Sequence, residues 1–163
     1  MEGYELYRNG KPYYVKGLGG DVNLDLVVKI GGNSIRTWGV ERAQQVLDEA
    51  QKRGLSVMLG FWLQHERHGF DYDNKDKVLK QLNYYKSIVD KFKNHPALLV
   101  WGIGNELNLQ YTNPACWNAV EDIADFFHTA DVGKFTEKLE WYLYEFHQIL
   151  KTRQVGGSSS RPD

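Results

Sequence analysis

Short apolar runs and longer stretches with an apolar residue at every third or fourth position follow one another along the chain. The segments that favour strands lie at 33–38, 56–62 and 98–103; the last two are mostly apolar, and the first contains Ile35 and Trp38 among polar residues. The periodic stretches lie at 43–50, 78–92 and 117–127. Runs of the first kind predict β-strands, and stretches of the second kind predict amphipathic helices that bury one face.

The beginning of the chain has the pattern of a β-hairpin. Asn9-Gly10 lies between two aromatic, strand-prone runs at residues 4–8 and 12–16. Asn-Gly in such a position is the strongest short-range signal for a hairpin. The glycine-rich residues 17–20 then predict a flexible turn, and the apolar residues within 24–30 predict a short helix.

The last part of the chain shows two further patterns. Apolar residues recur at helical spacing within residues 132–151, which predicts one more helix, and Gly and Ser dominate the end of the chain. We therefore expect a folded domain over residues 1–151 and a disordered tail over residues 152–163.

Each predicted strand is joined to the next through a helix rather than through a tight turn. This alternation predicts parallel strands joined by right-handed crossovers, as in an open α/β sheet or a (β/α) barrel. In both architectures ligands bind at the carboxyl ends of the strands. The side chains that matter for function should therefore follow the apolar runs.

Polar and aromatic side chains do gather at the ends of the three runs. Arg36 and Trp38 close the first run, and residues 62–65, with the sequence Trp-Leu-Gln-His, follow the second. The third run delivers an amide and a carboxylate, Asn105 and Glu106. These residues are the candidates for a functional site.

The composition disfavours several classes of partner. The chain has 163 residues, of which 42% are hydrophobic and 25% charged, and its formal net charge is −1. These values predict a soluble globular domain without the positive surface that would bind nucleic acid or an anionic membrane. No stretch approaches the ~20 apolar residues of a membrane span, and the N-terminus has no signal-peptide pattern, so the localisation stays open.

Cofactor chemistry also finds little support in the sequence. Cys116 is the only cysteine and is expected to serve as a small buried hydrophobe. His65 and His68 are three residues apart, whereas a helical zinc motif has its histidines four apart. The glycines within 17–20 fail the Gly-x-Gly-x-x-Gly spacing, because its sixth position is Val22. We expect neither a metal nor a nucleotide cofactor.

Five pieces of the chain match one family in order. They are RNGKPYYVKG, GGNSIRTWG, GFW, NHPALLVWGIGNE and WNAVEDIADFFH. Together they resemble the TIM-barrel glycoside hydrolases, and most of all the catalytic barrel of the family 2 type, over about residues 4–131. The resemblance implies an α/β fold, a partial (β/α) barrel of TIM type with about four β/α units, preceded by a β-hairpin.

The resemblance also implies roles for the candidate residues. Glu106 matches the general acid/base of these enzymes, Asn105 their ligand for the sugar 2-hydroxyl, and Arg36 an arginine that orients the nucleophile. A glycosidic oxygen is a poor leaving group, so an acid must protonate it as the bond breaks. Aromatic faces suit the C–H surface of a pyranose ring. The further candidate substrate contacts are Trp38, Trp62, His65 and Trp101.

One part of the family pattern has no match. A retaining glycosidase needs a second carboxylate about 5–5.5 Å from the first, and the family supplies it from the seventh strand. A complete barrel takes about 250 residues, so we expect the N-terminal half of a barrel, without the nucleophile and with little activity alone. Its open sheet edges predict a homodimer or a complementing half barrel as partner, beside an oligosaccharide or polysaccharide substrate.

Other interpretations of the same residues stay open. Glu106 could form a structural ion pair with Arg36, and Glu41, Asp71 or Asp73 could replace the missing carboxylate. For the whole chain, the first hypothesis is a glycoside hydrolase that acts on β-linked carbohydrates with retention. The alternatives are a non-catalytic carbohydrate-binding or interaction protein, and a truncated gene product without function.

Overall fold

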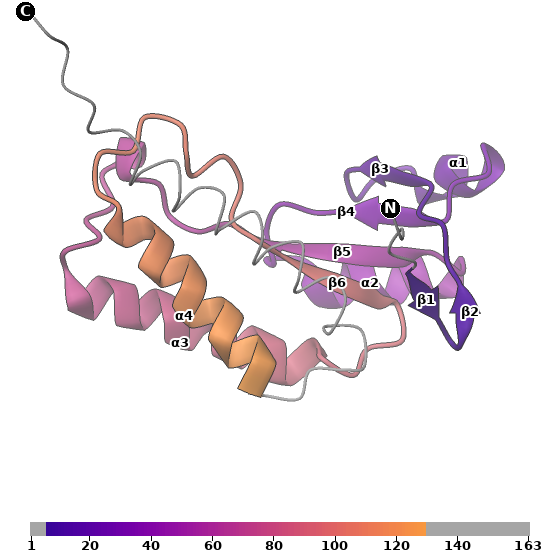
Figure 1. Cartoon of the computed structure of the whole chain (residues 1–163). Helices are drawn as coiled ribbons and strands as arrows, with labels where there is room; N and C mark the ends of the chain where they lie inside the picture. The colour runs from indigo at the N-terminus through magenta and orange to yellow at the C-terminus, as the bar shows by residue number, and fades with distance from the viewer. Residues whose placement is uncertain (1–5, 130–163) are drawn as a thin grey trace, which may run out of the picture.

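The computed structural model describes residues 6–129. The predicted helix at 132–151 and the predicted tail at 152–163 lie outside the described residues. Within them the chain forms short strands that alternate with helices, as Figure 1 shows. The strands are β1 (Tyr7–Arg8), β2 (Lys11–Pro12), β3 (Gly17–Gly19), β4 (Ser34–Arg36), β5 (Ser56–Phe61) and β6 (Leu98–Ile103). The helices are α1 (Leu24–Lys29), α2 (Ala43–Lys52), the 3-10 turn η1 (Glu66–His68), α3 (Lys75–Phe92) and α4 (Ala115–Thr129).

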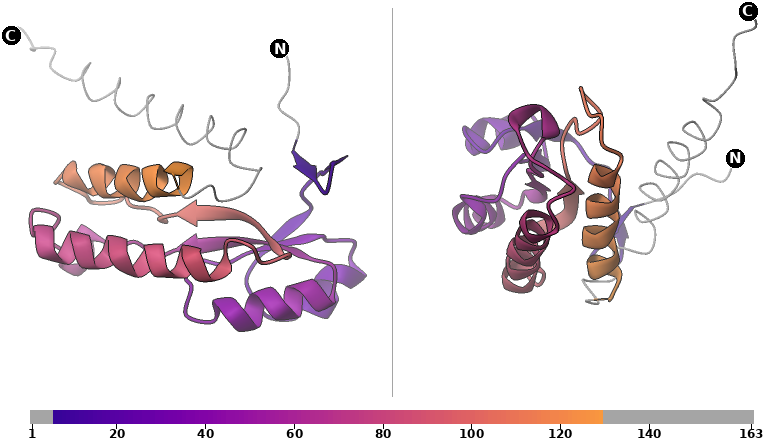
Figure 2. Two further views of the ribbon diagram at one scale, coloured as in Figure 1. Left: turned by 90° about the horizontal axis from the view of Figure 1, so that it is seen from below. Right: turned by 90° about the vertical axis from the view of Figure 1, so that its left-hand side faces the viewer.

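Four strands form one parallel sheet in the order β3-β4-β5-β6. Sequence order and spatial order are the same, and helices α1, α2 and α3 provide the crossovers. In the right-hand view of Figure 2, α2, α3 and α4 follow one another along an arc around the strands. This arrangement confirms the predicted α/β class, a partial barrel of parallel strands with helices outside.

The first strand of this sheet corrects the sequence prediction of a flexible turn at residues 17–20. Gly17–Gly19 is strand β3, and it pairs with β4 so that Gly19 lies opposite Arg36. A Cβ atom at Gly19 would lie 2.8 Å from the Trp38 ring, so the strand has room for this indole only because residue 19 lacks a side chain. Glycines carry no hydrophobic pattern, and the strand was therefore missed.

The predicted hairpin is present but short. β1 and β2 pair antiparallel, and the connecting Asn9 and Gly10 have φ values of 54° and 73°. Two successive left-handed residues make the kind of turn that Asn-Gly favours. The hydroxyl of Tyr13, just after β2, donates to the carbonyl oxygen of Asn33 at 2.8 Å and so ties the hairpin to the segment before β4.

The core lies between the sheet and the helices. In β6, Leu99 and Trp101 are buried, whereas their neighbours in the strand are half-buried. The buried positions contact the helical layer, in which α4 packs against β6 and α3. Trp101 stacks on Phe127 of α4 with a ring-centroid distance of 5.7 Å, and it lies 5.1 Å from Phe61 of β5.

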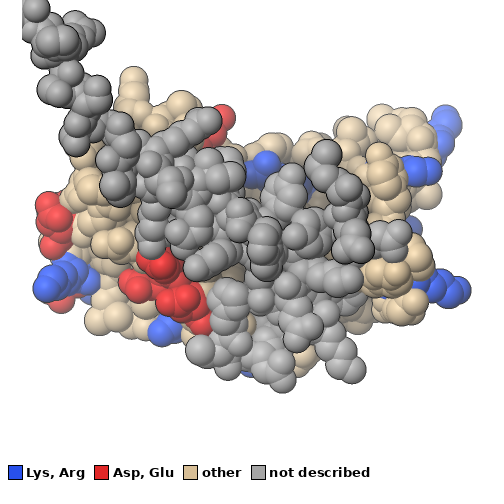
Figure 3. Space-filling model, in the orientation of Figure 1, with Lys and Arg blue, Asp and Glu red and all other residues tan. Residues whose placement is uncertain are grey.

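Helix α4 separates apolar from acidic residues. Its buried side chains, spaced three or four residues apart, are Cys116, Ala119, Ile123 and Phe127. Cys116 is a free cysteine with 1% of its surface exposed, which confirms its expected structural place. Acidic side chains gather over the outer side of this helix in Figure 3, and α4 carries Glu121, Asp122 and Asp125.

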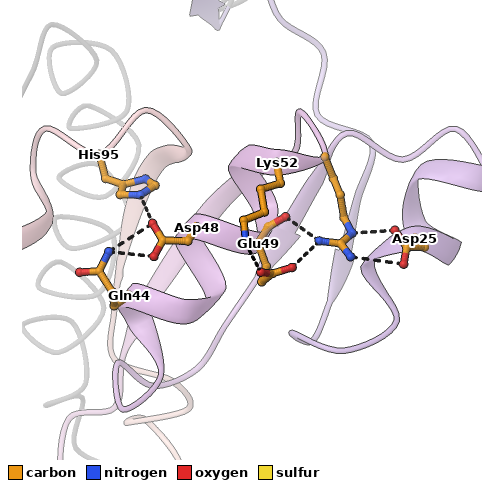
Figure 4. A network of polar contacts seen from close by, with 7 residues as sticks. Asp25, Gln44, Asp48, Glu49, Lys52 and His95 are labelled. Atoms are coloured by element: carbon orange, nitrogen blue, oxygen red, sulfur yellow. Dashed lines mark hydrogen bonds and ion pairs between the residues drawn. The ribbon is translucent and has the colours of Figure 1, made fainter.

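A polar network on α2 ties three parts of the fold together, as Figure 4 shows. Arg53, just after α2, donates to Asp25 of α1 at 2.7 Å and to Glu49 of α2 at 2.6 Å. His95, in the turn before β6, accepts from the backbone N–H of Ala97 through Nδ1. Its Nε2 therefore carries the hydrogen that it shares with Asp48 of α2 at 3.2 Å. The His-Pro element thus fixes the start of β6.

Among residues 6–129, no helix is both long and apolar enough to cross a membrane.

Candidate active site

The carboxyl ends of the parallel strands meet at one edge of the sheet. β4 ends at Arg36, β5 at Phe61 and β6 at Ile103. The candidate residues from the sequence follow these ends directly, so the fold brings most of them to one region. Figure 1 shows the loops after β5 and β6 extending beyond this edge toward the same side of the molecule.

A hydrogen bond connects the ends of two strands that are not neighbours. Arg36 donates from Nη2 to Oδ1 of Asn105 at 3.2 Å, past the intervening strand β5. Gly60 of β5 pairs with Gly102 of β6, and neither has a side chain that would block this path. A Cβ atom at Gly60 would also lie 2.2 Å from the Thr37 carbonyl oxygen, so the close approach of the backbone just after β4 requires glycine there.

Arg36 retains unused hydrogen-bonding capacity. Its Nε is buried, and neither a hydrogen bond to this atom nor an ion pair of Arg36 occurs among residues 6–129. The expected alternative, an ion pair between Arg36 and Glu106, is therefore not formed here. An unpartnered buried guanidinium nitrogen is costly, which indicates that a further acceptor belongs beside it.

Trp38 provides an open aromatic surface next to Arg36. The Arg36 guanidinium carbon lies 5.8 Å from the centre of the Trp38 ring, and 41% of the Trp38 surface is exposed. Trp38 also borders a hollow of about 240 Å³ between the ends of β3 and β4 and the start of α2. Glu41 and Asp21 line the same hollow.

Glu106 follows β6 in an uncommon backbone conformation. Its φ is 52°, in the left-handed region that few residues other than glycine adopt. Its side chain is 59% exposed, and its Oε2 lies 3.7 Å from Nη2 of Arg67. The carbonyl oxygen of Glu106 accepts from Nη1 of Arg67 at 3.2 Å. Glu106 therefore reaches solvent at the sheet edge, with a cation beside it.

Three rings form a stack at the end of β5. The rings of Trp62 and His65 are 4.9 Å apart, and those of His65 and His68 are 5.2 Å apart. His65 is only 2% exposed, and neither ring nitrogen has a hydrogen-bond partner among the described residues. Burial, and then the positive charges of Arg67 and His68, lower the pKa of His65. His65 is thus a neutral support behind Trp62 rather than an open sugar contact.

The structure places Trp101 away from the other candidates. Only 6% of its surface is exposed, and its ring packs between Phe61 and Phe127 on the helix side of the sheet. The expectation that Trp101 contacts a sugar does not fit this position. The sequence showed an aromatic residue near a strand end, but it did not show which face of the strand bears the ring.

Two functional candidates were missed in the sequence. Glu66 and Arg67 contact the loop that follows β6. In the sequence they lie between His65 and His68, in a segment that suggests a solvated or substrate-side loop and gives no role to these two residues. Among residues 6–129 no group of three or more His, Cys, Asp or Glu side chains could hold a metal ion. No local sequence pattern predicts these contacts, because the partners of the two residues are backbone groups about forty positions away.

The fold and the residues at the strand ends are typical of one class of enzymes. A parallel β/α sheet of the barrel type, with an asparagine and a glutamate directly after one strand, is the arrangement of the TIM-barrel glycoside hydrolases. Within this class, the sequence profile of the family described as "Glycosyl hydrolases family 2, TIM barrel domain" matches residues 8–133. The match covers well over half of the chain, and the chain belongs to this family.

Individual relatives agree with this assignment. A β-glucuronidase from Chlorocebus aethiops is 27% identical over an alignment of 119 residues, and the match covers 60% of this chain and 17% of that enzyme. The structure of a β-glucuronidase from an uncultured Clostridium sp. has a TM-score of 0.55 and 26% identity, and the match covers 78% of this chain and 25% of that one. The chain thus corresponds to a minor part of each of these enzymes.

Proposed function

We propose that this chain supplies the acid/base side of the active site of a retaining glycoside hydrolase that acts on β-linked sugars. Glu106 is the general acid/base. The proposal is supported most by the Arg36–Asn105 hydrogen bond, because it fixes the residue before Glu106 at the sheet edge where barrel enzymes have their sites. The exposure of the Glu106 side chain leaves its carboxyl accessible to substrate.

In the first step, the Glu106 carboxyl gives its proton to the glycosidic oxygen as the bond from this oxygen to the anomeric carbon breaks. A second carboxylate forms a bond to the anomeric carbon in the same step, which yields a glycosyl-enzyme and the free alcohol. In the second step, the Glu106 carboxylate takes a proton from water, whose oxygen replaces the second carboxylate at the anomeric carbon. Two displacements at one carbon retain its configuration.

Asn105 and the aromatic residues would hold the sugar. Arg36 occupies Oδ1 of Asn105, so the amide nitrogen is the group left to donate to a sugar hydroxyl. By the resemblance to the family, this is the 2-hydroxyl. Trp38, with its exposed ring, and the half-buried Trp62 offer flat surfaces for the pyranose.

We expect the second carboxylate to come from a further strand of the barrel. The structure describes four parallel strands, whereas the family takes its nucleophile from the seventh. The unpartnered Nε of Arg36 is suited to receive that carboxylate. We expect the missing strands from a longer polypeptide, a second copy of this chain or a complementing half barrel, and negligible hydrolysis by this chain alone. Glu41, Asp71 and Asp73 are weaker candidates for the second carboxylate.

The test compares substrates with different leaving groups. Both named relatives are β-glucuronidases, so aryl β-glucuronides are the first substrates to try, followed by aryl β-glucosides and β-galactosides. In the polypeptide or assembly that shows turnover, Glu106→Gln should slow the release of phenol by about 10²–10⁴-fold. In the glycosylation step, measured as kcat/KM for both substrates, the release of dinitrophenol needs no acid and should change much less. An equal loss with both substrates would overturn the role of Glu106.

The alternative function, carbohydrate binding without turnover, rests on the exposed Trp38. It predicts that oligosaccharides change the tryptophan fluorescence of this chain, that Glu106→Gln leaves this binding unchanged, and that no completed assembly hydrolyses them. Turnover that depends on Glu106 would exclude it.

A further inference from the structure

Two consecutive residues of opposite charge hold the loop that carries Glu106. This loop runs from Gly104 to Pro114, between β6 and α4, and Figure 1 shows η1 lying beside it. η1 contributes Glu66 and Arg67, whose side chains reach the two ends of the loop. We call this pair the Glu66–Arg67 clamp.

Arg67 holds the first half of the loop. Its Nη1 donates to the carbonyl oxygens of Glu106 at 3.2 Å and Leu109 at 3.5 Å. The same Glu106 oxygen accepts from the backbone N–H of Leu109 at 3.1 Å, which closes a turn over residues 106–109. The Arg67 side chain is only 17% exposed, so these contacts are shielded from solvent more than most surface ion pairs.

The turn needs such support because its backbone is unfavourable. Glu106 and Gln110 have φ values of 52° and 57°, and neither residue is a glycine. Left-handed conformations of this kind persist only where the surrounding structure imposes them, and they are frequent at active sites. Arg67 bonds the carbonyl of the first of these residues and the carbonyl just before the second.

Glu66 holds the other end of the loop. Its Oε2 accepts from the backbone N–H groups of Thr112 at 2.7 Å and Asn113 at 3.0 Å, and its Oε1 accepts from the Thr112 hydroxyl. These bonds, the one from the Thr112 hydroxyl first, lower the pKa of Glu66, which keeps it ionised. The Glu66 carboxylate thus accepts from N–H groups before α4, and the Arg67 guanidinium donates to carbonyl groups after β6.

From this geometry we propose that Glu66 and Arg67 are positioning residues that fix the direction in which Glu106 meets the glycosidic oxygen. The proposal rests on the proposed role of Glu106. Arg67 donates a hydrogen bond to the backbone carbonyl oxygen of Glu106. The Glu106 carboxylate is farther away, with its Oε2 at 3.7 Å from Nη2 of Arg67. This distance is too long for a hydrogen bond, so the carboxyl keeps both oxygens available for proton transfer while its orientation is restricted.

The clamp can be tested without turnover. Hydrogen exchange in the chain should be faster by about fivefold or more at the Leu109 amide in Arg67→Met, and at the Thr112 and Asn113 amides in Glu66→Gln. Arg53→Met removes a comparable arginine from the α2 network and is the matched control. It should leave exchange in residues 105–113 unchanged. Uniform exchange changes in all three variants, or none in the loop, would overturn the clamp.

The positioning role is tested in the assembly that hydrolyses aryl glycosides. Arg67→Met should reduce kcat/KM, which reports the glycosylation step, at least about tenfold more for a phenyl than for a dinitrophenyl glycoside, and Arg67→Lys should restore part of this difference. Arg53→Met should lower both rates in the same ratio, if at all. A leaving-group dependence in Glu106→Gln but not in Arg67→Met would refute the positioning role alone. If Glu106→Gln itself shows no leaving-group dependence, both the proposed function and the positioning role are refuted.

Discussion

Glycine at position 106 should give a more stable protein than alanine, which is the reverse of the usual order. The reason is the left-handed backbone conformation of Glu106. An L-residue in the left-handed region is less stable by about 1–2 kcal/mol, a penalty that glycine does not have. Glycine also makes the unfolded chain more flexible, which lowers stability by about 0.4–1 kcal/mol relative to alanine. Both substitutions lose the exposed contact with Arg67. Glu106→Gly should therefore be more stable than Glu106→Ala by about 1 kcal/mol.

The matched control is Lys80, an exposed residue in the interior of α3. There the usual order holds, and Lys80→Ala should be more stable than Lys80→Gly by about 1 kcal/mol. Urea unfolding measures both pairs. With a slope of roughly 2 kcal/mol/M, each difference shifts the midpoint by about 0.5 M, in opposite directions at the two sites. Glu106→Ala as stable as Glu106→Gly would show that residue 106 is not strained in solution.

Three further predictions concern stability and pH. Trp101→Ala removes the ring between β5 and α4 and should lower the free energy of unfolding by about 3–5 kcal/mol in a urea titration, whereas a loss below about 1 kcal/mol would place this ring outside the core. The pKa of Glu66 is lowered in the folded protein, so its stabilising effect is present above the ordinary pKa of 4.5 and lost as the pH falls through the folded value. Unfolding curves at pH 6 and pH 3 should then differ less for Glu66→Gln than for the parent. The pKa of His65 is lowered from 6.5, so the unfolded chain binds the proton more readily and stability should decrease as the pH falls below 6.5. His65→Phe should weaken this decrease, and an unchanged pH dependence would contradict the burial of a neutral ring.

The sequence predicts the main elements of the fold because their patterns are strong. β5 and β6 were expected at 56–62 and 98–103 and occur at Ser56–Phe61 and Leu98–Ile103. The helix expected to start at residue 78 starts at Lys75 instead, because the Asn74 side chain accepts from the backbone N–H of Lys77 and caps it. A cap lies outside the hydrophobic stripe, so periodicity alone misplaces the boundary.

The remaining differences have physical causes that a linear pattern does not record. β3 consists of Gly17, Leu18 and Gly19, and its existence depends on pairing with β4. Side chains of β6 alternate between the two faces of the sheet, and Trp101 lies on the face that packs against the helices. An apolar run with no clear alternation does not show which residues lie on which face. Arg67 acts on carbonyl groups of a distant loop, and no residue type in that loop signals this contact.

Adding azide to Glu106→Ala tests whether Glu106 is the acid/base of a retaining glycosidase. A dinitrophenyl glycoside can still form the glycosyl-enzyme, because its leaving group needs no proton, but no base remains to activate water. Azide needs no base, and it can attack the anomeric carbon while the second carboxylate leaves. In the assembly that hydrolyses the parent substrate, we predict faster turnover of this variant with azide and a glycosyl azide of β configuration. No rate increase, or a glycosyl azide of α configuration, would contradict the account.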